Sequence, residues 1–210
     1  MTNGTVRRIV VGISGASGVQ YGVCALEMLA QLGVETHLVL TKGARATLAL
    51  ETDLSPADVR ARATVVHAEH DLGAVISSGS FPVDGMLVAP CSVKSLSGIA
   101  HSHNENLLVR AADVTLKERR PLVLLLRETP LHAGHLRMMA LVTEAGAIVM
   151  PPVPAFYTRP TSVADVVTHS VGRALDLLRL SHPGTERWDP GTRGRAAVTD
   201  DDQLPRIAPH

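Results

Sequence analysis

Short apolar runs alternate with amphipathic stretches along most of this chain, and that alternation severely limits the folds it can adopt. Residues 8–13 are continuous, apolar and rich in β-branched side chains, which predicts a buried strand. Strands of this kind that alternate with helices predict an α/β, Rossmann-like three-layer αβα fold with a mostly parallel sheet. Further strands are expected at 36–40, 85–89, 122–126 and 147–150, and helices at 19–32, 42–50, from Ser55, at 92–100, 106–119, 131–145 and 162–180.

Composition indicates one domain and narrows the class of protein. The 210 residues are 45% hydrophobic but only 2% aromatic, so the core must be aliphatic. Twenty basic residues balance 20 acidic ones, which argues against a nucleic-acid binder. No apolar run approaches a membrane span, and two cysteines cannot form a disulfide framework. We therefore expect a cytoplasmic protein.

The composition changes near the end of the chain. From residue 181 onward it is rich in Pro, Gly, Arg and Asp and poor in apolar side chains. We expect one domain over residues 1–180 and a tail over residues 181–210 that is flexible or wraps a neighbouring subunit. Trp188 is the tail residue that could anchor such an arm.

Two glycine- or serine-rich turns follow predicted strands, where ligands bind in a parallel sheet. In the first, residues 12–18, backbone N–H groups and the hydroxyls of Ser14 and Ser17 could face an anion at a helix start. Its spacing is neither the dinucleotide GxGxxG nor the GxSxG elbow, and a tight turn with incidental serines is the alternative. The second begins at Ser92, which could equally be only an N-cap. Two such turns fit a ligand with a phosphate and further polar groups.

Charged side chains near two predicted strands suggest functional positions. Arg110 and Lys117 are seven residues apart and project from one helical face among apolar neighbours, although a solvated helix end is the alternative. Arg127 and Glu128 directly follow an apolar strand, where a charged pair is costly unless it is paired or used. An ion pair at a strand edge would also explain them.

Other candidates are weaker on their own. The proline-rich segment 151–157 presents Phe156 and Tyr157 side by side, and Arg173 lies within an otherwise apolar helix face. Two histidine pairs have no third ligand at convincing spacing, so no metal site is expected. These pairs are His101 with His103 and His132 with His135.

Taken together, the segments resemble the UbiX-type flavin prenyltransferases, a family of homo-oligomeric flavoproteins formerly described as aromatic acid decarboxylase subunits. The resemblance runs from about residue 8 to residue 180 and rests on six motifs in order. They are GISGASG (12–18), LETD (50–53), SSGSF (77–81), PCSVKSLSGIAH (90–101), RAADVTLKERRPLVLLLRETPLH (110–132) and MPPVPAFY (150–157).

The resemblance implies an enzyme that joins dimethylallyl monophosphate to reduced FMN, at N5 and C6, without a metal. FMN would be a substrate, and the prenylated FMN would pass to a UbiD-type decarboxylase. The site would form where subunits meet in a large, commonly dodecameric, homo-oligomer.

The resemblance also implies roles for the residues of this sequence that occupy the family's site positions. The resemblance implies that FMN is held by Gly15, Ala16, Ser17, Thr41, Ser92, Val93, Lys94, Ser95 and Arg127. The dimethylallyl phosphate would be held by Arg110, Lys117, Tyr157 and Arg173. The residues expected to take part in catalysis are Ser17 and Glu51, as proton carriers, with Lys117, Glu128 and Tyr157.

Two other functions stay open. One is a cysteine-peptide decarboxylase of the related flavin-containing superfamily, although residues 90–95 lack that group's PASANT-type segment. The other is a non-catalytic FMN-binding subunit that supports a separate decarboxylase.

Overall fold

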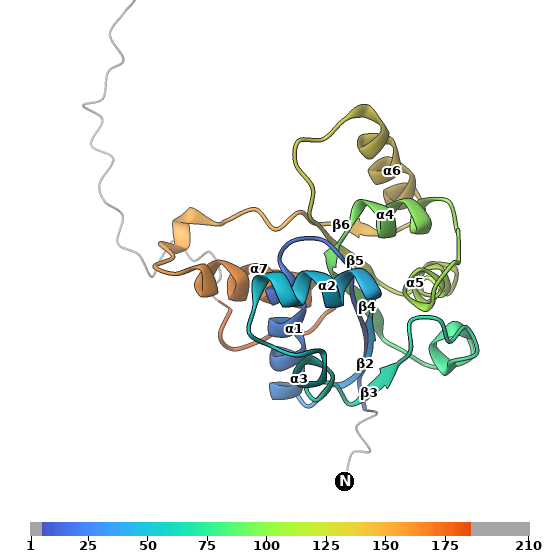
Figure 1. The fold of residues 1–210 in the computed structure, drawn as a ribbon, viewed down its shortest axis with the longest axis horizontal. Helices are drawn as coiled ribbons and strands as arrows, with labels where there is room; N and C mark the ends of the chain where they lie inside the picture. The colour runs from blue at the N-terminus through green and yellow to red at the C-terminus, as the bar shows by residue number, and fades with distance from the viewer. Residues whose placement is uncertain (1–5, 186–210) are drawn as a thin grey trace, which may run out of the picture.

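The computed structural model describes residues 6–185, which form a six-stranded sheet covered by helices on both faces (Figure 1). The strand order is β3-β2-β1-β4-β5-β6, and every neighbouring pair is parallel. This confirms the predicted Rossmann-like α/β fold. The strands are β1 (Arg8–Ile13), β2 (Glu35–Leu40), β3 (Val65–His67), β4 (Gly85–Cys91), β5 (Leu122–Leu126) and β6 (Ile148–Val149).

Seven helices and two short 3-10 turns connect the strands within the described part of the chain. Several begin at polar N-caps: the Ser92 side chain, as the sequence predicts, accepts a backbone N–H bond at the start of α4, and the Asn106 side chain does the same at the start of α5. The helices are α1 (Val19–Gln31), α2 (Lys42–Glu51), α3 (Pro56–Arg60), α4 (Val93–Ala100), α5 (Leu107–Lys117), α6 (Ala133–Glu144) and α7 (Val163–Leu177). The 3-10 turns are η1 (Val75–Ser77) and η2 (Phe156–Thr158).

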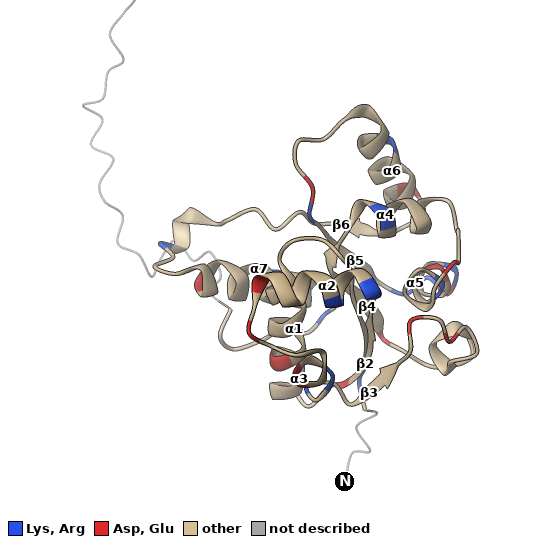
Figure 2. Cartoon of the chain, in the orientation of Figure 1, with Lys and Arg blue, Asp and Glu red and all other residues tan. Residues whose placement is uncertain are grey.

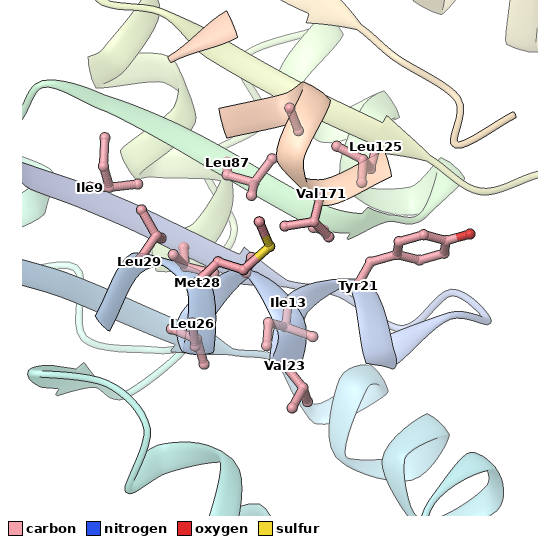
Figure 3. Packing of buried hydrophobic residues seen from close by; sticks show 14 of the residues in the cluster. Ile9, Ile13, Tyr21, Val23, Leu26, Met28, Leu29, Leu87, Leu125 and Val171 are labelled. Carbon is pink, nitrogen blue, oxygen red and sulfur yellow. The ribbon is translucent and has the colours of Figure 1, made fainter. Parts of the chain in front are cut away.

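The sheet separates two aliphatic cores. Because successive strand residues point to opposite faces, Ile9 and Val11 pack with α1 and α7, whereas Val10 packs with α4 and α5. Figure 3 shows the first core, where Leu87 of β4, Leu125 of β5 and Val171 of α7 converge. α5 and α7 therefore lie on opposite faces of the sheet.

Helix α1 lies unusually close to the middle of the sheet because of a glycine. A Cβ atom built on Gly22 would lie 2.3 Å from the Ala89 carbonyl oxygen and 2.7 Å from Cδ1 of Ile13. A larger residue at this position would push α1 away from β1 and β4.

Strand β3 is the element that the sequence analysis missed. It has only three residues and lies at the sheet edge, which is too short for a periodic pattern. Its pairing with β2 is extended by two bonds between Thr36 and Thr64, in which each backbone N–H donates to the other residue's hydroxyl, at 3.1 and 3.0 Å.

Apolar side chains remain exposed around α6 and the segment that follows β6. Val153 is 74% exposed, Phe156 76% and Leu136 53%. Elsewhere on the surface, acidic and basic residues are interspersed in the view of Figure 2, in keeping with the zero net charge. Within residues 6–185, no helix is long and apolar enough to cross a membrane.

Of the tail predicted over residues 181–210, only residues 181–185 belong to the described part, and Trp188 lies outside it. Within this short piece Thr185 is buried and packs against Gly172 of α7. The described chain therefore keeps contact with the domain a few residues past 180.

Candidate functional site

A cleft of about 850 Å³ opens beyond the carboxyl ends of β1, β2 and β4. The chain leaves β1 toward β2 but leaves β4 toward β5, so the strand order reverses between β1 and β4, which is where ligands bind in such sheets. The volume suits a cofactor-sized ligand. Of the residues expected to hold FMN, the cleft is lined by Gly15, Thr41, Ser92, Val93, Lys94 and Ser95.

Ser14 joins the two loops that flank the reversal point. Its hydroxyl donates to the Pro90 carbonyl oxygen at 2.8 Å and accepts from the Ser92 N–H at 2.7 Å. The residue is only 1% exposed. The expectation that this hydroxyl could donate to an anion is therefore wrong, because its hydrogen is already used within the protein. Ser14 instead fixes the spacing between the turn after β1 and the start of α4.

Glu51, the last residue of α2, caps the first turn of α1. Its carboxylate accepts the N–H of Gly18 at 2.9 Å and the N–H of Val19 at 3.1 Å. Partial burial alone would raise the pKa of the Glu51 carboxyl, but bonds from the Ser17 side chain and from these two N–H groups, with the charge of Arg127, hold its pKa below the ordinary value. Glu51 is therefore ionised near neutral pH.

Arg127 and Glu128 do not form the ion pair that the sequence allowed. Arg127 directs its Nε to the Ser17 carbonyl oxygen at 3.2 Å, so it lies against the turn after β1. Glu128 is exposed, and its carboxylate accepts the N–H of Thr129 at 2.9 Å. No salt bridge joins the two side chains in the part of the chain that the structure describes. Arg127 thus lies beside the turn after β1 but, like Ala16 and Ser17, is not among the residues that line the cleft.

Several helices begin at or near the cleft: α2, α4, α5 and α6 have N-caps that line it, and carboxylates cap the starts of α1 and α2. Glu51 occupies the start of α1, and Glu69 accepts the N–H of Lys42 at the start of α2. At the start of α4 the Ser92 hydroxyl accepts only the N–H of Ser95, and in residues 6–185 no carboxylate accepts the N–H of Val93 or Lys94. Since a helix start favours negative charge, α4 offers an open anion position, and it lies directly at the reversal of the strand order, whereas the starts of α5 and α6 are capped by Asn106 and His132.

The residues expected to hold the second substrate are divided between the two faces of the sheet. On α5, Arg110 bonds the Ser77 carbonyl oxygen at 3.2 Å and Asp113 at 2.9 Å. Lys117 ends this helix beside Gly79 and pairs with Glu118. α5 returns toward the start of β5, so Lys117 lies near the amino ends of the strands, away from the cleft.

Tyr157 and Arg173 lie on the α7 side of the sheet. The Tyr157 hydroxyl is 3.3 Å from Nε2 of His169, and Arg173 bonds Asp176 at 2.7 Å. Since α5 and α7 cover opposite faces, one chain does not bring Lys117 together with Arg173.

His132 and His135 line the cleft, although the sequence analysis considered them only as metal ligands. Their rings are in contact, with centroids 3.6 Å apart and planes tilted by 31°, and Nδ1 of His132 accepts the N–H of Gly134 at the start of α6. Their position just after a buried strand was the signal that could have placed them here. In the described residues, no group of three or more His, Cys, Asp or Glu is arranged to hold a metal ion.

Comparison with known proteins identifies the family. A family model described as Flavoprotein matches residues 2–173. Flavin prenyltransferase UbiX of Escherichia coli is 56% identical over 179 residues, which cover 85% of this chain and 95% of the relative. This chain belongs to the UbiX-type flavin prenyltransferase family. The UbiX of Thauera aromatica is likewise 56% identical, over 86% of this chain and 93% of the relative.

Solved structures of the family share the fold. AnUbiX, in complex with FMN and dimethylallyl pyrophosphate, is 52% identical, with a TM-score of 0.87 over 88% of this chain and 98% of that chain. A dodecameric FMN-dependent UbiX-like decarboxylase from Escherichia coli is 48% identical, with a TM-score of 0.85 over 87% of this chain and 99% of that one. By contrast, the FMN-dependent cysteine decarboxylase TvaF is 17% identical, with a TM-score of 0.56 over 80% of this chain and 99% of that one, and therefore shares only the fold.

Proposed function

We propose that this flavin prenyltransferase joins the dimethylallyl group of dimethylallyl monophosphate to reduced FMN, at N5 and C6 of the flavin. The identity of 56% with flavin prenyltransferases of two bacteria carries the proposal. The cleft at the reversal of the strand order supports it, because six of the nine residues that the family resemblance assigns to FMN line it.

The start of α4 is the position that fits the FMN phosphate. Its N–H groups face no carboxylate of the described chain, and Lys94 adds an exposed cation. Thr41 completes this side of the cleft. Charge-assisted bonds from such donors to phosphate are short and strong. The exposed turn at Gly15, Ala16 and Ser17, with Arg127 beside it, would then hold the rest of the flavin.

Ser17 and Glu51 form a route for a proton. The Ser17 side chain bonds the Glu51 carboxylate, whose lowered pKa keeps it ready to accept a proton. A proton released near the turn could pass to the Ser17 hydroxyl while the hydroxyl proton moves to Glu51. The two N–H bonds from Gly18 and Val19 would hold the carboxylate in place during this transfer.

The leaving phosphate would be held by groups from more than one chain. Lys117 and Arg173 lie on opposite faces of the protomer, so a neighbouring copy must bring the two sets together. Exposed apolar residues such as Val153 and Phe156 offer a surface for that assembly. We infer a homo-oligomer, a dodecamer as in the similar Escherichia coli structure, with Arg110 and Glu128 lining the shared site.

We place the protein in the cytoplasm, where its two cysteines, which are free in the structure, stay reduced. Its product would serve a UbiD-type decarboxylase, because prenylated FMN is of use only to an enzyme that binds it.

Incubation of the purified protein with reduced FMN and dimethylallyl monophosphate tests the proposal. A mass gain of one prenyl unit on the flavin is expected, and a parallel reaction with the pyrophosphate compares the two donors. Flavin binding without product would favour a non-catalytic subunit. Oxidation of a cysteine-ending peptide would favour the cysteine decarboxylase.

Variants test the assignment of residues. Lys117→Ala and Tyr157→Phe should retain FMN but lose prenylation, because both residues lie outside the cleft. Arg60→Ala, which removes an exposed cation from α3, is the matched control. Mixed oligomers of Lys117→Ala and Arg173→Ala chains should regain part of the activity if the site is shared. Equal loss of FMN binding in both single variants would show that their roles are misassigned.

A further inference from the structure

One face of α7 displays two groups that could act on the same anion. His169 and Arg173 are four residues apart on this helix, so their side chains lie one turn apart on the same face, with Cβ atoms about 6 Å from each other. The α7 helix is anchored on its other side by Val167, Val171 and Leu175, which are buried in the core against α1. The two side chains are therefore presented by a rigid element.

Tyr157 is docked over the first of these groups. Its hydroxyl lies 3.3 Å from Nε2 of His169, and the two rings meet edge to face, at 86° with centroids 5.8 Å apart. The segment between Tyr157 and α7 is tied down by Asp165, whose carboxylate accepts the N–H groups of Thr161 and Ser162 at 2.8 and 2.9 Å. The His169 contact thus holds the phenol over α7, and the chain between them is tied to the start of that helix.

An open cavity of about 320 Å³ reaches His169. Thr158, Arg159 and Thr168 line it together with the imidazole. The cavity therefore leaves His169 accessible from outside, next to the segment that carries Tyr157, although neither Tyr157 nor Arg173 is among its lining residues.

We propose that His169 is a positioning residue, which holds the Tyr157 hydroxyl beside Arg173 so that phenol and guanidinium form one clamp for the phosphate of the prenyl donor. The inference rests on the proposed function, and it adds a residue to which neither the family resemblance nor the sequence pattern assigned a role. His169 itself does not contact the reacting atoms.

The hydrogen-bond chemistry sets the direction of the contact. A neutral imidazole with its hydrogen on Nε2 donates to the phenol oxygen, which leaves the phenol hydrogen for a phosphate oxygen. Arg173 uses Nη1 for Asp176, and its other guanidinium N–H groups lie on the same fork. Without the imidazole, Tyr157 can rotate about its side-chain bonds, and its hydroxyl loses its place beside the guanidinium.

Steady-state prenylation by the assembled enzyme, with dimethylallyl monophosphate as the varied substrate, tests this role. His169→Leu should raise the KM for the prenyl phosphate about tenfold while the affinity for FMN stays unchanged, since one hydrogen bond to a phosphate ligand is loosened. His169→Gln, whose amide nitrogen can take the place of Nε2, should restore most of the affinity. His70→Leu, at an exposed loop position, is the matched control.

A double substitution separates positioning from a general structural effect. Because Tyr157→Phe is expected to lose prenylation, this comparison uses direct binding of dimethylallyl monophosphate to the FMN-loaded enzyme, measured by calorimetry for the wild type, both single variants and the double variant. In the Tyr157→Phe background, His169→Leu should weaken that binding no further, because the hydroxyl that it positions is absent. Additive effects of the two substitutions, or failure of His169→Gln to restore what His169→Leu loses, would overturn the inference. If the wild-type enzyme forms no prenylated FMN, it is the proposed function that fails. If Tyr157→Phe impairs the enzyme but His169→Leu matches the wild type, only the role of His169 fails.

Discussion

Replacement of Ser14 by alanine tests whether one hydroxyl holds the two sides of the cleft together. The substitution removes the hydroxyl that accepts the Ser92 N–H at 2.7 Å, so this N–H loses its acceptor. The Pro90 carbonyl oxygen loses the Ser14 hydroxyl as a donor but still accepts the Ser14 backbone N–H at 3.2 Å. A buried donor without a partner costs about 1–3 kcal/mol, so we expect a loss of roughly 2 kcal/mol in the free energy of unfolding. For a chain of this length that corresponds to a fall in Tm of about 4–8 °C.

Thermal unfolding followed by far-ultraviolet circular dichroism measures this loss. All samples need the same protein concentration, because the Tm of an oligomer depends on it. Ser78→Ala, which removes an exposed hydroxyl, is the control and should stay within about 1 °C of the wild type. FMN affinity, measured by fluorescence titration, should fall for Ser14→Ala because the start of α4 is no longer fixed. An unchanged Tm for Ser14→Ala would refute the reasoning.

Three further predictions follow from other contacts. Gly22→Ala should lower the free energy of unfolding by about 1–3 kcal/mol in urea titrations, because the new Cβ atom would lie 2.3 Å from the Ala89 carbonyl oxygen. Helix propensity alone would predict a higher free energy of unfolding for the alanine variant, and that result would contradict the prediction. Glu51→Gln should lower the free energy of unfolding by about 1 kcal/mol at pH 7. Because the pKa of Glu51 is lowered in the folded state, the stability that its carboxylate contributes is lost as the pH falls through that pKa. The difference between Glu51→Gln and the wild type should therefore shrink below pH 4.5 and not grow. Burial, and after it the charge of His37, lowers the pKa of His67 below its ordinary 6.5, so the folded state binds this proton less tightly than the unfolded state. The free energy of unfolding should therefore fall as the pH drops below 6.5. Denaturant midpoints measured against pH should show a flatter slope for His67→Gln than for the wild type, and equal slopes for the two proteins would contradict this prediction.

Much of the fold could be predicted because its signals are local. The apolar runs at 8–13 and 122–126 coincide with β1 and β5, and the predicted cap Ser92 begins α4. β3 could not be read because a three-residue edge strand has no periodicity, and its extra bonds come from Thr36, far away in the sequence.

The site was predictable to the level of its loops but not of its contacts. Residues just after strands had to meet at one edge of a parallel sheet, which placed the turn at 12–18 beside Ser92. That Glu51 would cap α1 depends on where the end of α2 falls, which no local pattern encodes. The inward turn of the Ser14 hydroxyl likewise depends on the distance between β1 and β4.

The carboxylates of Glu51 and Glu69 have a consequence for how a ligand enters the cleft. They neutralise the starts of α1 and α2 with charges that belong to the protein, so the attraction for a phosphate is left to the helix starts without a carboxylate, among them α4 at the reversal of the strand order. A molecule with a phosphate at one end and a flat ring at the other would then be oriented by its charged end before the ring makes any contact. In this way two acidic residues that cap neighbouring helices would decide which way round FMN binds.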